Sequence, residues 1–175
     1  MVSQLKVNQI VTQSGSTITL GNSGDTVNLG SGASQSLAVN SPNFKVTLSG
    51  NVTLTNDANV KITFDTATYN IGSAFDTSTN KFTVPSGGAG KYYFFYKGYM
   101  GNNLGYYSLK IYKNGSQFST WTSYHHANTD NTLMDEHTDV LDLAEGDYIE
   151  TYAQTTSGNG TFQSNHSHFG GYKLL

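Results

Sequence analysis

Hydrophobic and polar residues alternate along most of this chain, as they do in β-strands with one buried face. Short examples are STITL, DTVNL and FKVTL in the first third of the sequence, and DVLDL and YIETY in the last third. No segment keeps the 3.6-residue period of an amphipathic helix. The pattern therefore predicts an all-β fold.

Residues 1–57 form a first segment, in which Gly, Ser and Asn separate short V/I-x-L units. Such units hold too few apolar residues for a core of their own, so they bury surface only by stacking or by meeting other chains. We expect a short β-rich trimeric shaft or attachment segment, and a Ser/Gly-rich linker is the alternative. The apolar pairs that would share a face are Ile18 and Leu20, Val27 and Leu29, Val46 and Leu48, and Val52 and Leu54.

Residues 58–175 form a second segment, which holds all 12 Tyr and the single Trp of the chain. Asn114-Gly115 and Asn159-Gly160 are typical of type I′ hairpin turns, and the turn at Glu145–Asp147 separates two further strand-like runs. Strands of this length and spacing predict a sandwich or jelly roll.

The stretch TVPSGGAGKYYFFY joins a Gly-rich run to a Lys and an aromatic block. A phosphate-binding P-loop would need a Gly where Pro85 stands and a Ser or Thr where Tyr92 stands. We therefore interpret the run as a turn between a strand that ends at Phe82–Pro85 and a buried strand at Tyr92–Tyr96.

Composition excludes several classes of function. Charged residues make up 12% of the chain, the net charge is −3, and all nine basic residues are Lys. Since Arg is the preferred residue for bidentate phosphate and base contacts, we expect no nucleic-acid partner. The chain has no Cys for a disulfide or a thiolate zinc site. It shows no signal-peptide core and no long apolar run, so we expect neither secretion by a signal peptide nor membrane insertion.

Four motifs in residues 58–175 resemble the globular head of complement C1q, in the order found in that family. They are YNIGSAFDTSTNKFTVPSGGAGKYYFFYKG, LKIYKNGSQF, DVLDLAEGDYIETYA and SHFGGYKLL. The resemblance implies a ten-stranded jelly roll of the C1q and tumour-necrosis-factor type, assembled as a homotrimer. Its first and last strands would lie beside the threefold axis, with both chain ends at the base and loops at the apex.

The N-terminal stretch LKVNQIVTQSGSTITL is similar to the start of many phage tail-fibre and appendage proteins. This resemblance implies a virion component whose segment 1–57 attaches to other tail or virion proteins. It also implies that the head recognises a host-surface glycan or protein. The alternative is a structural capsid-decoration, baseplate or surface-assembly protein that binds no receptor.

His166-Ser167-His168 is a candidate metal site. In a strand, residues i and i+2 point to one face, so His166 and His168 would leave the same side. If that side faces a threefold axis, three chains bring six imidazoles together, which suits octahedral coordination of a transition-metal ion. His-x-His elements of T-even phage long tail fibres hold metal in this way. Two polar surface residues in a hairpin are the alternative.

Two loop regions, KGYMGNNLGYY and STWTSYHHANTDN, combine aromatic rings with amides and carboxylates. Aromatic rings stack on the C–H groups of sugars while polar groups bind the hydroxyls, so these regions are candidate recognition surfaces. An exposed loop without this role is the alternative, above all for the two adjacent histidines. The candidate receptor-binding residues are Tyr99, Asn102, Asn103, Tyr106, Trp121, Tyr124, His125 and His126.

For an enzyme, the best candidates are Asp135, Glu136, His137 and Asp139, which could serve acid/base chemistry such as glycoside cleavage. The competing interpretation is a solvated loop that enters a strand at Val140–Leu143. We expect the loop, and hence a non-enzymatic binding protein with no firmly expected cofactor.

Overall fold

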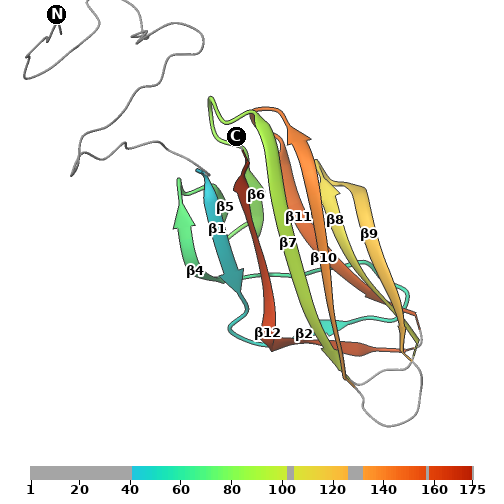
Figure 1. Ribbon diagram of the computed structural model, residues 1–175. Coiled ribbons are helices and arrows are strands. Elements are labelled where there is room, and N and C mark those ends of the chain that lie inside the picture. The colour runs from blue at the N-terminus through green and yellow to red at the C-terminus, as the bar shows by residue number, and fades with distance from the viewer. Residues whose placement is uncertain (1–40, 102–104, 126–131, 157, 175) are drawn as a thin grey trace, which may run out of the picture. The chain divides into compact units, whose positions relative to one another are not determined.

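The computed structural model describes residues 41–101, 105–125, 132–156 and 158–174, and within these ranges the chain forms strands and turns. The strands are arranged in two layers (Figure 1). Their bounds are β1 (Asn43–Thr47), β2 (Val52–Leu54), β3 (Val60–Lys61), β4 (Thr66–Ile71), β5 (Phe75–Asp76), β6 (Lys81–Thr83), β7 (Gly90–Gly101), β8 (Gly105–Lys113), β9 (Ser116–His125), β10 (Thr132–Leu143), β11 (Tyr148–Thr155) and β12 (Gly160–Lys173).

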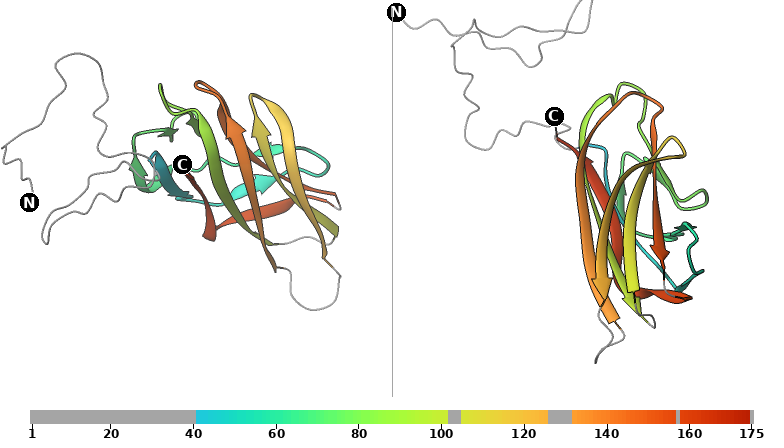
Figure 2. Two further views of the ribbon diagram at one scale, coloured as in Figure 1. Left: turned by 45° about the horizontal axis from the view of Figure 1, so that its top comes forward. Right: turned by 90° about the vertical axis from the view of Figure 1, so that its right-hand side faces the viewer.

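The strands form two antiparallel sheets that pack face to face, as the two views of Figure 2 show. The first, sheet A, has the order β10-β7-β12-β1-β4, and β2 pairs with the first three residues of β12. The second, sheet B, has the order β5-β6-β11-β8-β9, with β3 paired to β11. The predicted all-β sandwich is confirmed.

The sandwich begins before residue 58, where the sequence placed the start of the head. Strands β1 and β2 both pair with β12, and their apolar residues Val46, Leu48 and Leu54 are buried in the core of the same chain. The V/I-x-L units of β1 and β2 are therefore core strands of the head, because β12 offers them an edge to pair with. The corresponding units around Ile18 and Val27 lie outside the described residues, so the shaft stays a prediction.

Of the four predicted turns, two form as expected and two do not join paired strands. The run after Phe82 links β6 to β7 as expected, and Asn114-Gly115, with φ values of 52° and 77°, closes the β8–β9 hairpin. The turn at Glu145–Asp147 instead links β10 of sheet A to β11 of sheet B, and β12, which starts at Gly160, also lies in the sheet opposite β11. Those two hairpin predictions are wrong, because these turns carry the chain from one sheet to the other.

An aromatic cluster fills the space between the sheets, and Phe169 of β12 lies at its centre. Its ring centroid is 5.1 Å from that of Phe44, 5.9 Å from that of Phe94 and 6.1 Å from that of Phe75. All four side chains are at most 4% exposed. Stacked and edge-on rings of this kind add to the stabilisation that comes from burial alone.

Two glycines follow Phe169, and both are needed for close packing. A Cβ added to Gly170 would lie 2.2 Å from the ring of Phe95, and one added to Gly171 would lie 2.5 Å from the ring of Phe94. The rings of β7 therefore cover β12 on both faces of sheet A, one ring over each glycine.

The two ends of the sandwich differ in what they hold. The start of β1 and the end of β12 lie at one end, while β7, β8, β9 and β10 meet at the opposite end (Figure 1). We call the second one the distal end, and it is where the candidate recognition residues gather.

Replacing Phe169 by Ala should lower the free energy of unfolding by about 3–5 kcal/mol, because the cavity would lie amid several rings that cannot collapse together. Chemical denaturation at a fixed protein concentration measures the change. The control Phe118→Ala, at a side chain 53% exposed, should change stability by no more than about 0.5 kcal/mol. Equal effects of the two substitutions would contradict the assigned core.

Candidate functional site

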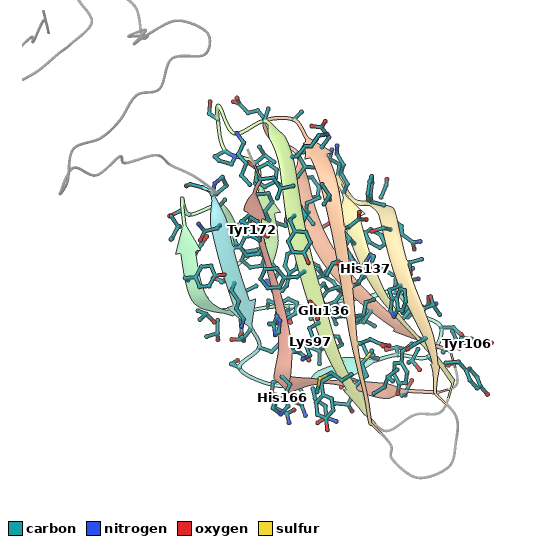
Figure 3. The ribbon with its side chains drawn as sticks, in the orientation of Figure 1. Lys97, Tyr106, Glu136, His137, His166 and Tyr172 are labelled. Atoms are coloured by element: carbon teal, nitrogen blue, oxygen red, sulfur yellow. The ribbon has the colours of Figure 1, made fainter. Side chains whose placement is uncertain are left out.

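An aromatic pair marks the distal end of sheet B. Tyr106 of β8 and Tyr124 of β9 lie opposite each other in register, with ring centroids 4.8 Å apart. Although the rings contact each other, Tyr106 is 51% and Tyr124 is 54% exposed. Figure 3 shows Tyr106 projecting from this end of the sandwich. The pair offers two rigid rings to a ligand at low cost in side-chain entropy.

Trp121 lies on β9, at the side of the sandwich where β9 of sheet B faces β10 of sheet A. It is opposite Leu109, a core residue, so its side chain leaves the core face of sheet B, yet it is 51% exposed because β9 is the outermost strand. Ser119 and Ser123, two residues away on either side, contact β10. Tyr106 and Tyr124 leave the other face of sheet B, so the three rings lie on β8 and β9 but not on one face. We call Tyr106, Trp121 and Tyr124 the distal cluster.

Two hydrogen bonds join β9 to β10 and so connect the edges of the two sheets. Ser119 Oγ and His137 Nε2 are 2.9 Å apart, and Ser123 Oγ donates to Asp135. Asp135 and His137 therefore belong to a strand of the sandwich, and the predicted solvated loop before Val140 is wrong. The side chains at Asp135, His137 and alternate positions point inward because the strand continues its two-residue alternation through this stretch.

A Ser–His pair is also the beginning of a nucleophilic site, so its surroundings matter. His137 is only 8% exposed, and burial lowers its pKa, while the nearby Asp139 partly offsets this effect. The Oδ1 atom of Asp139 accepts a hydrogen bond from the backbone N–H of Val140, 2.8 Å away. A buried imidazole that holds two sheet edges together has a structural role, and we assign that role to the pair.

His166 and His168 lie on the outward face of sheet A. The ring of His168 packs edge-on against Phe95, with centroids 5.8 Å apart, and the ring of His166 packs against Tyr99, with centroids 5.7 Å apart. The regular alternation assumed for these residues is interrupted, because the β12–β7 register shifts between Gln163 and His168 and His166 has a φ of 68°. Both rings nevertheless lie beside outward-facing aromatics of β7.

Charged groups surround His168 on three neighbouring strands. Lys97 of β7 lies opposite it in register, and Lys45 of β1 and Glu136 of β10 are close enough to affect it. Burial lowers the pKa of His168 first of all, the two lysines lower it further, and Glu136 acts in the opposite direction. Figure 3 shows Lys97 and Glu136 on adjacent strands, with His166 at the bend of β12.

The rest of this outward face is rich in aromatic and apolar side chains. Tyr93 and Tyr172 are opposite each other in register, and Phe95 covers Gly170. Four of the exposed large hydrophobic residues of the described chain lie at the two borders of the same sheet. They are Tyr69 and Ile71 of β4, 42% and 55% exposed, and Met134 and Val140 of β10, 46% and 50% exposed.

Several predicted site residues cannot be placed with the others. Asn102, Asn103 and His126 lie outside the described residues, and His125 is described only as the last residue of β9. Within the described ranges no group of three or more His, Cys, Asp and Glu side chains could hold a metal ion. Among the same residues, no helix has the length and apolar character needed to span a bilayer.

Sequence reasoning missed the lysines beside His168 and the aromatic face around them. The face had a signal, since KYYFFYKGYM is aromatic at both odd and even positions, which is typical of a strand covered on both sides. The lysines had none, because β1, β12 and β7 meet only in the folded sheet.

Comparison with known proteins places this fold among its relatives. A family model described as C1q domain matches residues 43–174. The globular domain of zebrafish complement 1qA protein has a TM-score of 0.56 and 17% identity, over 77% of this chain and 98% of that chain. The Eiger TNF of S. frugiperda has a TM-score of 0.50 and 17% identity, over 76% and 90% of the two chains. No curated protein matches the sequence.

Acidification should destabilise the head through His137. Because burial lowers its pKa in the folded state, the unfolded chain binds more protons, and the free energy of unfolding should fall as pH drops from about 7 through 6. Asp147, whose pKa is about 2 because Lys113 and Asn114 donate to it, adds a loss only below about pH 4. Denaturant midpoints measured between about pH 7 and pH 4 should depend less on pH in His137→Gln than in the wild-type protein.

His166→Gln is the matched control, since it removes an exposed histidine from the same sheet. An unchanged pH dependence in His137→Gln would contradict the assigned role of its burial. Part of the slope should remain in that variant, because burial and the two lysines also lower the pKa of His168.

Proposed function

The chain belongs to the C1q domain family, and we propose from this that it is a homotrimeric adhesion head that binds a glycan or protein on a host-cell surface. Domains of this type are generally non-enzymatic and typically form homotrimers. The observation that carries the proposal is the distal cluster, whose three rings are each about half exposed, with Tyr106 and Tyr124 in contact on one face of sheet B and Trp121 on the other face of β9.

The outward face of sheet A supports the trimer. A soluble monomer rarely exposes a large contiguous apolar surface, and here Tyr93, Phe95 and Tyr172 form the centre of one, with apolar residues at both borders. Three copies that cover this face leave the distal ends free. Each trimer then presents three identical binding sites, which raises avidity without any increase in the affinity of one site.

The chemistry of the distal cluster supports a glycan or a mixed glycan–protein target. Trp121 lies between Ser119 and Ser123 on the same face of β9, and these serines bond to His137 and Asp135, so a flat ring and polar groups occur on one face. The remaining predicted contact residues are Tyr99, which lies on the opposite sheet, and Asn102, Asn103, His125 and His126.

A place on a phage tail fibre is the finer part of the proposal. It rests on the sequence of residues 1–57, whose opening resembles tail-fibre proteins and which would attach the head to other tail or virion proteins. The corresponding location is the virion. Sandwich strands β1 and β2 begin within this range, so the attachment segment would end before Asn43.

A metal ion held on the threefold axis by His166 and His168 stays a prediction with mixed support. Both rings lie on the face that the trimer would cover. Lys45 and Lys97, however, repel a cation at His168, so the residues present fit a transition metal poorly unless His166 alone supplies the ligands.

Binding should depend on the distal cluster. Fluorescently labelled protein titrated onto a panel of bacterial strains should bind at least one strain saturably. On that strain Trp121→Ala and Tyr124→Ala should each weaken binding by at least about tenfold, because exposed aromatic anchors dominate recognition energy. Phe118→Ala, an equally exposed ring on β9 nearer the other end of the strand, should bind normally.

Absence of saturable binding on every strain would reject the adhesion role and favour a structural role on the virion. Binding that survives all substitutions in the distal cluster would move the site elsewhere on the head.

Native mass spectrometry of the purified chain should report a trimer. Phe95→Asp should give monomers, because it places a charge at the centre of the apolar face, whereas Phe118→Asp should leave the trimer intact. A wild-type monomer would reject the trimer. Repeating the measurement with a chelator tests the axial metal, and a mass unchanged by the chelator would reject it.

A further inference from the structure

Three basic side chains lie together at the centre of the outward face of sheet A, on three neighbouring strands. Lys97 of β7 is opposite His168 of β12, which is opposite Thr47 of β1, and Lys45 is two residues along β1 from Thr47. Side chains at such positions are about 5–8 Å apart at their Cβ atoms. We call Lys45, Lys97 and His168 the basic patch.

The lysines of this patch differ from most others in the chain because they make no hydrogen bond or ion pair with any described residue. Lys61 and Lys81 pair with Glu150, Lys91 with Asp142, and Lys113 with Asp147. Lys45 and Lys97 are nonetheless half-buried among the aromatic residues of the face. Lys45 has no charged cross-strand neighbour, since Gly170 and Tyr69 lie opposite it, whereas Lys97 has Glu136 opposite it in register.

Covering the face would take these two ammonium groups out of water. A buried charge is strongly unfavourable unless an opposite charge pairs with it. His168 cannot supply a negative charge, and Glu136 forms no ion pair with Lys97 although the two lie opposite each other in register. Whatever covers the face must therefore bring carboxylates to the basic patch.

The same chain has a suitable surface at the border of sheet A. Strand β10 is the outermost strand there, and its outward-facing carboxylates are Glu136 and Asp142. Asp142 pairs with Lys91 of the same chain, whereas Glu136 forms no ion pair with any described residue. The exposed apolar residues Met134 and Val140 lie on the same strand, and Glu136 shares their outward direction. We call Glu136, with Met134 and Val140 on either side of it along β10, the acidic edge.

We propose that the acidic edge of one copy docks on the basic patch of the next copy, with Glu136 as the carboxylate that meets Lys45 and Lys97. This rests on the proposed homotrimer and adds the charged contacts that fix how its copies meet. The contact joins two different surfaces, edge to face, so it is heterologous and can close a ring of three. Met134 and Val140 then contact the aromatic centre of the neighbouring face.

The arrangement also determines which residues can report on the contact. Within one chain, β12 and β7 separate β1 from β10, so Lys45 and Glu136 do not meet across adjacent strands. Within one chain the two residues can influence each other only indirectly, since both act on the charge of His168. Coupling between them in the association constant of the trimer therefore reports on a contact between copies. Lys97 is less informative, because Glu136 of the same chain is its cross-strand neighbour.

The test is a charge exchange in the full chain, read by sedimentation equilibrium and native mass spectrometry. Lys45→Glu and Glu136→Lys should each weaken trimer association by at least about tenfold, because each places like charges together in the contact. The double variant Lys45→Glu/Glu136→Lys should restore most of the lost association. Lys91→Glu, on the same face but paired within its own chain, should leave the trimer unchanged.

Each other outcome has a definite meaning. A trimer that tolerates both single exchanges, or a double variant no better than the singles, overturns the proposal while leaving the trimer intact. If the single variants dissociate and inorganic phosphate rescues Glu136→Lys but the double exchange does not, the patch takes a free oxyanion instead of a neighbour's carboxylate. A monomeric wild-type chain overturns this proposal together with the proposed trimer.

Discussion

The position of β12 between β7 and β1 is the constraint on which the rest of the head depends. β12 pairs with β1 and β2 from the start of the described chain and with β7 from its middle, so it joins segments far apart in sequence. Its Phe169 enters the core, and the two glycines that follow let β7 lay one ring over each face. Without that close approach, sheet A could neither fill the core nor hold Phe95 over Gly170 on its outward face.

Each face of sheet A therefore has a different task. The inward face packs on sheet B. The outward face combines aromatic residues with Lys45 and Lys97, a combination that is unusual on the solvent-exposed surface of a monomer. The last strands of the two sheets, β10 and β9, are tied together by Ser119–His137 and Ser123–Asp135. This link connects the two sheets along one side of the sandwich, and Trp121 lies on β9 between the two linked serines.

Much of the head could be predicted from sequence, and the errors have physical causes. The turn before Tyr92 and the hairpin at Asn114-Gly115 depend on a few adjacent residues, so local chemistry was sufficient. The stretch from Asp135 to Asp139 was expected to be a loop because its residues are polar, yet it is a strand whose inward polar groups bind serines of β9. The units at Val46 and Val52 were expected to need other chains, but β12 of the same chain covers them.

By itself, the sequence determined the all-β class, most turn positions, the motifs of the family and the exposed aromatics of the distal end. These features depend on the alternation of hydrophobic and polar residues and on short runs of neighbouring residues. Only the tertiary structure decided which strands share a sheet, that Lys45, Lys97 and His168 form one patch, and that His137 is buried. An alternating pattern shows that a strand has one buried and one exposed face, but it does not show which strand lies beside it. That depends on pairing between residues more than a hundred positions apart, as in β1 and β12.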